Sequence, residues 1–322
     1  MALLVAFFQA PSLPQADASY NAGRFSDAAA QYRALLKQNP NEPAILLRLA
    51  ASEYQLGDYA SAAKNFRAVL NSQPDLPPAL VGLGTSLITI GRSAEAIPYL
   101  EKAVKLSPAD RMARRSLGHA YQDQEKFVEG EAILRQLVNE DPRDVEAWYY
   151  LGLLFFDRNY ALPALEAFEK TLALQPGNLR AQIYRAGCLA VLGRLDEAEK
   201  AFSALSADQR ASADPEFQLG YAQFLFNTDR PAEALAAAER GVKTAPDSVK
   251  LRYWRARLLA ETGKPGEAVA EAERAMKLAP EMPNPRHLLV RLYRMQGRDA
   301  DAAAQAAWLR ARSAQKIRGS AR

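Results

Sequence analysis

The chain has 322 residues, of which 49% are hydrophobic and 24% charged, and its formal net charge is +4. This balance is typical of a folded globular protein and excludes a disordered chain. The single cysteine, Cys188, excludes an intramolecular disulfide and a cysteine-based metal site. The sequence also lacks any run of 18 apolar residues, so it predicts no membrane-spanning helix.

The N-terminal stretch has features of two different kinds of segment. Residues 1–8 (MALLVAFF) are all apolar, and Ala16-Asp17-Ala18 fits a small-x-small cleavage site. No Lys or Arg precedes Arg24, so the charged region that usually opens a signal peptide is missing. Two interpretations remain open: a signal sequence or its remnant, and an apolar segment that caps the first repeat. The compartment, exported (periplasmic) or cytoplasmic, is open with them.

From Gly23 onward a residue suited to a turn recurs every 34 positions, with one step of 36. The series is Gly23, Gly57, Gly91, Glu125, Asn159, Gly193, Asp229, Gly263 and Gly297. The fifth residue after each of these is always Ala or Gly. A small side chain where two helices cross lets their axes come close. The period therefore predicts nine consecutive helix pairs, each with its turn at the recurring residue.

Proline marks the end of most of these units, because it cannot continue a helix. The stops are Pro40, Pro74, Pro108, Pro142, Pro176, Pro246 and Pro280. The missing stop would fall near Arg210, inside the segment 206–214, which also holds the two extra residues. We predict an irregular junction there, a longer loop in the first instance and a hinge as the alternative.

The clearest unit spans residues 145–178. Trp148 and Phe155 lie on one face of its first helix, Ala164 and Phe168 on one face of its second, and Pro176 ends it. At a period of 34 residues this pattern resembles the tetratricopeptide repeat.

The resemblance covers about residues 9–312 and implies an all-α fold, a right-handed superhelical solenoid of antiparallel helix pairs with a concave groove. The apolar segment 1–8 would precede this array, and a basic tail, residues 313–322, would follow it.

No motif in the sequence indicates catalysis. The two histidines, His119 and His287, lie in different units, and neither belongs to an HExxH pattern. GxSxG and Walker-type motifs are absent, and Leu87 stands where a dinucleotide-binding loop starting at Gly82 needs its third glycine. Cys188 lies among apolar residues, as a packing cysteine does. We therefore predict a protein that is not an enzyme, with no small-molecule substrate, cofactor or metal.

In the family that the chain resembles, the first helix of each pair lines the groove. Stepping the period through three positions of this helix gives candidates that are apolar and aromatic early on and cationic at the far end. They are Tyr54, Arg115, His119, Tyr149, Phe156, Phe226, Tyr253, Arg257, His287, Arg291 and Arg294. For each aromatic residue, packing between repeats is the alternative role.

These candidates predict a scaffold that binds a peptide or protein segment in the groove. Its apolar side chains would meet the aromatic residues, and an acidic group would meet the arginines.

Two other functions remain open. One is RNA binding by a helical repeat of the pentatricopeptide type, but the period is 34 rather than 35 residues. Residues 308–322 carry five cations and no acid, so the rest of the chain has a net charge of about −1, which argues against nucleic acid. The other is a regulatory or sensor part of a larger enzyme system.

Overall fold

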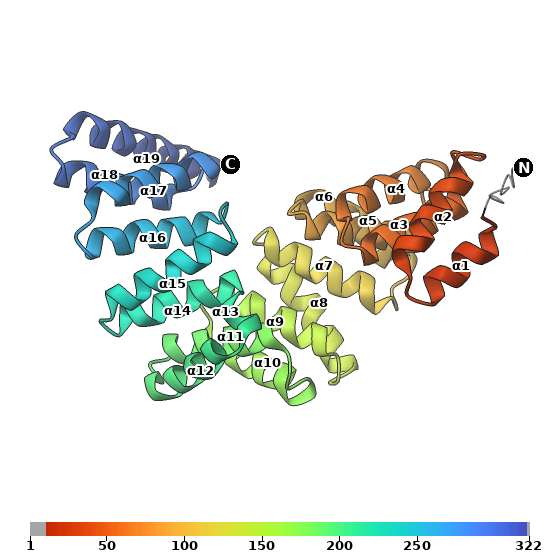
Figure 1. The fold of residues 1–322 in the computed structure, drawn as a ribbon, viewed down its shortest axis with the longest axis horizontal. Helices are drawn as coiled ribbons and strands as arrows, with labels where there is room; N and C mark the ends of the chain where they lie inside the picture. The colour runs from red at the N-terminus through yellow and green to blue at the C-terminus, as the bar shows by residue number, and fades with distance from the viewer. Residues whose placement is uncertain (1–10, 321–322) are drawn as a thin grey trace, which may run out of the picture. The chain divides into compact units, whose positions relative to one another are not determined.

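The structure is a computed structural model that describes residues 11–320, with side chains described as far as Ala314. This part of the chain is helical, in agreement with the predicted all-α class, and contains no strand (Figure 1). The apolar segment 1–8, for which two roles were open, lies outside the described residues. Among these residues no helix is both long and apolar enough to cross a membrane.

The chain divides into two compact units, Met1–Tyr160 and Ala161–Arg322. The helices of the first unit, in order, are α1 (Leu13–Asn21), α2 (Phe25–Leu36), α3 (Pro43–Gln55), α4 (Tyr59–Ser72), α5 (Pro77–Thr89), α6 (Ser93–Leu106), α7 (Arg111–Asp123), α8 (Phe127–Glu140) and α9 (Val145–Asp157). The second unit contains α10 (Ala161–Leu174), α11 (Leu179–Val191), α12 (Leu195–Ala207), α13 (Gln209–Ser212), α14 (Pro215–Asn227), α15 (Pro231–Thr244), α16 (Val249–Glu261), α17 (Pro265–Leu278), α18 (Pro283–Met295) and α19 (Asp299–Ser320). Helix α19 runs past residue 312, where we expected the array to end.

The helix bounds confirm the 34-residue period. The first helices α3, α5, α7, α9 and α11 each have 13 residues and begin 34 positions apart. The next first helix, α14, begins 36 positions after α11, and α16 and α18 return to the 34-residue step. Each repeat therefore presents the same helix length to its neighbour.

The recurring turn residues all adopt the left-handed conformation. The φ angles at the nine predicted positions lie between 55° at Glu125 and 79° at Gly57 and Gly263. Six of the nine are glycines, which reach this region without steric cost, whereas Glu125, Asn159 and Asp229 carry side chains there. The predicted turns are confirmed at every position.

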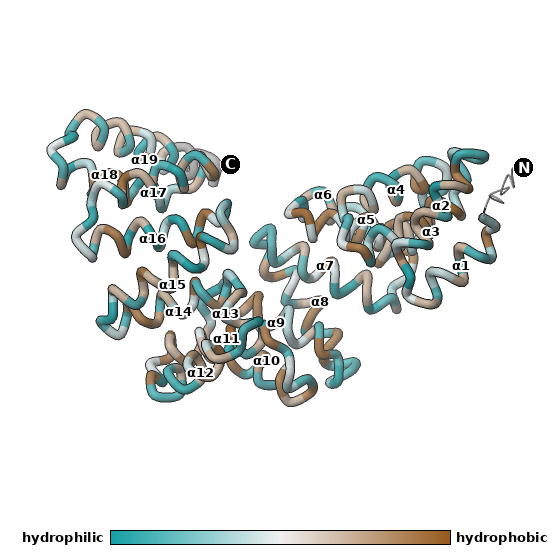
Figure 2. The backbone as a smooth tube through the Cα atoms, viewed as in Figure 1, coloured by the Kyte–Doolittle hydropathy of each residue, from teal (hydrophilic) through white to brown (hydrophobic). Residues whose placement is uncertain are grey.

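The core lies where the two helices of a pair cross. The small residues that follow the turns are all buried, and Ala164 and Ala198 have no exposed surface. The large side chains of Phe168 and Phe202 fill the space beside them and are themselves fully buried. Figure 2 shows the result, with hydrophobic residues recurring along the helices and hydrophilic ones gathered at many of the turns.

The junction that holds the two extra residues is a short helix, α13, and not the longer loop that we predicted. The side chain of Asp208 accepts a hydrogen bond from the backbone N–H of Arg210 (2.7 Å) and so caps this helix. Ala211 is fully buried, and Gln218 of α14 donates its amide to the carbonyl oxygen of Ser212 (2.6 Å). These contacts anchor the insertion on the next first helix.

Candidate functional site: the first-helix face

The candidate site in each unit is the face of the first helices that the repeat position predicts to line a groove, here called the first-helix face. In the first unit Tyr54 comes from α3, Arg115 and His119 from α7, and Tyr149 and Phe156 from α9. All five side chains are half-buried. Each therefore contacts its own unit and also presents a part of itself to solvent.

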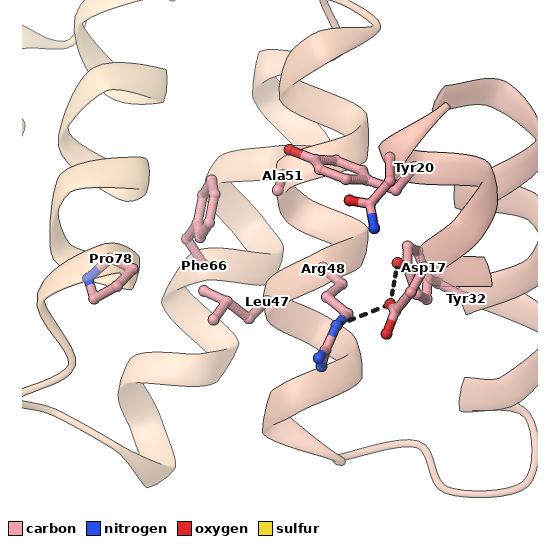
Figure 3. A pocket seen from close by; sticks show the side chains of 9 residues that line it. Asp17, Tyr20, Tyr32, Leu47, Arg48, Ala51, Phe66 and Pro78 are labelled. Atoms are coloured by element: carbon pink, nitrogen blue, oxygen red, sulfur yellow. Dashed lines mark hydrogen bonds and ion pairs between the residues drawn. The ribbon is translucent and has the colours of Figure 1, made fainter. Parts of the chain in front are cut away.

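In the first unit this face contains a hollow of about 460 Å³ at its N-terminal end. Figure 3 shows Leu47, Phe66 and Pro78 on one side, Asp17, Tyr20 and Tyr32 on the other, and Arg48 between them. We call this cavity the α1–α5 hollow, because its lining comes from those five helices.

The polar side of the α1–α5 hollow is organised around Asp17. Its carboxylate accepts a hydrogen bond from the Tyr32 hydroxyl (2.6 Å) and lies 2.9 Å from Nε of Arg48. Burial raises the pKa of Tyr32 well above its usual range, and the hydrogen bond to Asp17 raises it further. The hydroxyl therefore stays protonated and keeps Asp17 in place, so the hollow has one apolar wall and one fixed polar wall.

Sequence reasoning missed Asp17 and Tyr20 but contained the signal for both. Ala51 and Tyr54 stand at the repeat positions that we predicted to line the groove, and one 34-residue step back from each gives Asp17 and Tyr20. We had not extended the series into the first repeat. The structure places Asp17, Tyr20 and Ala51 around the same hollow.

Arg115 is tied to the neighbouring first helix. Its guanidinium lies 3.1 Å from Asp144 and 2.8 Å from Glu146, and Arg111 also contacts Asp144 at 2.7 Å. Asp144 is buried and caps α9 by accepting the backbone N–H of Ala147 (2.9 Å). The charge of Arg115 is therefore already balanced within the unit.

Burial alone would raise the pKa of Asp144. The hydrogen bonds from Arg111 and Ala147 and the charges of Arg115 and Arg111 outweigh burial, and the net result is a lowered pKa. Asp144 therefore stays ionised and holds both arginines.

His119 stacks on a residue that the sequence analysis did not select. The imidazole lies over the ring of Tyr150, with centroids 4.5 Å apart and planes 22° apart, and Asp123 is 3.6 Å away. Burial lowers the pKa of His119. The negative charges of Asp123 and Asp157 act in the opposite direction but do not outweigh burial. Tyr149 lies beside Tyr150, with ring centroids 5.6 Å apart. The part of this face that α7 and α9 form is thus an aromatic surface of His119, Tyr149 and Tyr150.

In the second unit the first-helix face is built around Arg257 of α16. Its guanidinium lies 4.6 Å from the ring centroid of Phe226 on α14 and 4.8 Å from that of Trp254. The two rings meet edge to face at 5.9 Å. No acidic oxygen of the described residues lies within 4.0 Å of Arg257. We call Phe226, Trp254 and Arg257 the arginine clamp.

Trp254 was also missed by sequence reasoning. It occupies the same repeat position as Tyr150, one residue after the position of Tyr149 and Tyr253. A series of equivalent positions that started from this residue would have selected both Tyr150 and Trp254.

The other predicted residues of the second unit lie on α16, which carries Arg257, and on the next first helix, α18. Tyr253 is half-buried, with its ring edge-on to Trp254 at 6.3 Å. On α18, His287 and Arg294 are exposed, and Arg291 lies 3.2 Å from Glu261. The prediction of a cationic far end thus corresponds to residues on two neighbouring helices, α16 and α18. Within the described residues no group of His, Cys, Asp and Glu could hold a metal ion.

Two family profiles, both described as tetratricopeptide repeat, match most of the chain. One matches residues 13–79, 198–249 and 222–283, and the other matches residues 87–152 and 163–214. The sequence matches no curated protein at a significant level.

Solved structures of several repeat proteins have a similar fold. A tetratricopeptide repeat protein from Parabacteroides merdae has 21% identity and a TM-score of 0.63, with 78% of this chain and 98% of that chain covered. A chain of the APC/C hetero-tetramer Cut9–Hcn1 has 15% identity and a TM-score of 0.62, with 87% of this chain and 55% of that chain covered. The human IFIT1 dimer with PPP-AAAA has 17% identity and a TM-score of 0.58, with 87% of this chain and 67% of that chain covered. At these identities the similarity establishes the fold alone.

Proposed function

The chain belongs to the tetratricopeptide repeat family, whose members generally serve as protein-interaction scaffolds, and from this premise we propose a specific mode of binding. It is a non-catalytic scaffold that holds a segment of a partner protein against its first-helix face. The observation that carries the proposal is the α1–α5 hollow of about 460 Å³, whose lining includes Asp17, Tyr20 and Ala51 at repeat positions expected to line a groove.

The lining of the α1–α5 hollow suits a side chain of a bound segment. Leu47, Phe66 and Pro78 offer an apolar wall, while Asp17 and Arg48 form a polar rim that is already hydrogen-bonded. Binding sites for organic groups usually combine a largely apolar lining with a few fixed polar groups. An aromatic or large aliphatic side chain therefore fits the apolar wall, and its backbone can hydrogen-bond at the rim.

The test fills the hollow without changing the fold. Ala51 is half-buried at the hollow, and Ala60 of α4 is exposed, so Ala51→Trp and Ala60→Trp form a matched pair. The full chain and both variants are immobilised, extracts of the native source are passed over them, and the captured proteins are quantified by mass spectrometry. We expect Ala51→Trp to lose a defined set of proteins that Ala60→Trp retains, at equal thermal stability.

Two outcomes would contradict the proposal. If both variants capture the same proteins in the same amounts, the hollow does not hold the segment. If nuclease treatment releases the proteins that depend on Ala51, the chain binds them through RNA. The second outcome is included because the human IFIT1 structure of similar fold is a complex with PPP-AAAA.

A further inference from the structure

The arginine clamp contains a cation that its own unit leaves without an acidic partner. On α16, Arg252 and Arg255 both contact the buried carboxylate of Glu271, at 2.9 and 3.1 Å. On α18, Arg291 contacts Glu261. Within the described part of the chain, Arg257 has no such carboxylate within 4.0 Å, although it lies on the same helix as the paired arginines.

The two rings of the clamp hold this cation in one place. A cation over an aromatic ring is attracted by the negative face of the ring. No described residue accepts a hydrogen bond from the Arg257 guanidinium, so its N–H groups stay available to a ligand. Phe226 comes from α14 and Trp254 from α16, so the packing of two helices fixes the rings. Arg257 is therefore ordered before any ligand binds and loses little freedom when one does.

The surroundings of the clamp favour an anion. The first helices α16 and α18 together carry seven Lys or Arg residues. Arg252 and Arg255 are paired with Glu271, and Arg291 is paired with Glu261, so four of these cations have no ion pair among the described residues. His287 and Arg294 are exposed on α18. An excess of one charge on a face raises the local concentration of ligands of opposite charge.

We propose that Arg257 binds a carboxylate side chain, Asp or Glu, of an acidic segment in a partner protein. The planar edge of a guanidinium matches a carboxylate and can donate two parallel hydrogen bonds to it. Arg294 and His287 add long-range attraction for further acids of the same segment. This inference rests on the proposed function in one respect, namely that the anion belongs to a protein.

The clamp favours a protein over a single-stranded nucleic acid. Nucleic-acid sites of this kind use aromatic faces as platforms on which bases stack. Here Arg257 covers one face of each ring, Phe226 and Trp254, so those faces are closed to a base. A carboxylate needs only the edge of the guanidinium.

The experiment measures binding of a labelled hexaglutamate peptide to the full chain by fluorescence anisotropy at low salt. Hexaglutamine and a six-nucleotide oligouridylate serve as comparison probes. Arg257→Gln removes the clamp cation, and Lys250→Gln is the matched control, because Lys250 is an exposed cation on the same helix. Arg257→Lys keeps the charge and removes the planar fork.

We expect Arg257→Gln to weaken hexaglutamate binding by about tenfold and Lys250→Gln by less than about twofold, with Arg257→Lys between them. Hexaglutamine should not bind measurably. Three results would overturn the inference: equal losses in Arg257→Gln and Lys250→Gln, equal binding of the two peptides, or tighter binding of oligouridylate that depends on Arg257.

The synthetic probe also separates this inference from the proposed function. Hexaglutamate has no apolar side chain for the α1–α5 hollow, so Ala51→Trp should leave its binding unchanged. The capture experiment can thus fail while the clamp binds its probe, and the clamp can fail while the capture succeeds.

Discussion

Glu125 allows a direct measurement of the free-energy cost of the left-handed conformation at the recurring turn. It is one of three turn residues that carry a side chain in the left-handed region, with φ at 55°. Its side chain is exposed and makes no ion pair with any described residue, so replacing it removes no tertiary contact. The left-handed conformation costs an L-residue about 1–2 kcal/mol. Glycine removes this cost but adds about 0.4–1 kcal/mol of unfolded-chain entropy. Glu125→Gly should therefore stabilise the protein by about 0.5–1 kcal/mol.

The assay is urea unfolding followed by circular dichroism, with the midpoint compared at unchanged slope. Asn159→Gly should give a smaller gain, because asparagine tolerates the left-handed region better than glutamate. Gly57→Ala, at φ of 79°, should destabilise by about 1 kcal/mol or more. A lower or unchanged midpoint for Glu125→Gly, together with a neutral Gly57→Ala, would refute the link between these turns and backbone strain.

Further predictions concern buried charges and the single thiol. Glu271→Ala should lower the free energy of unfolding by about 3 kcal/mol, because it leaves Arg252 and Arg255 half-buried without their main partner, and urea unfolding measures this loss. The lowered pKa of Asp144 contributes stability that is fully present above the unfolded value of 3.8 and is lost as pH falls through the lower folded value. Urea midpoints measured below pH 4 should therefore fall more steeply for the natural chain than for Asp144→Asn. Burial raises the pKa of Cys188 to about 12, so a thiol reagent at pH 8 should react with it only after urea unfolds the chain, and rapid reaction in the folded state would contradict its burial.

The repeat made the helices and turns predictable, because nine copies of one pattern reinforce each other. A single Glu at position 125 or Asp at position 229 would not by itself indicate a left-handed residue. The 34-residue step from neighbouring glycines identifies both. The same step selected Arg257, Tyr149 and the other candidates from equivalent positions of the first helices.

The contacts of the candidate residues were less predictable, since they depend on side chains that differ from repeat to repeat. Arg115 and Arg291 were both selected as groove cations, yet each meets an acid about one repeat away, Asp144 and Glu261. No period identifies these pairs, because the equivalent positions in other repeats are mostly uncharged. Helix α13 was unpredictable for a similar reason, because it occurs once.

The equal lengths of the first helices affect how the chain can gain or lose repeats during evolution. An insertion or deletion of 34 residues within the regular part adds or removes one complete helix pair and leaves the joining surfaces alike. The segment between α12 and α14 is different, because α13 is anchored to Gln218 of the following helix. Duplication or loss of a whole repeat should therefore be tolerated on either side of this segment. A duplication or loss that includes the segment itself should be selected against.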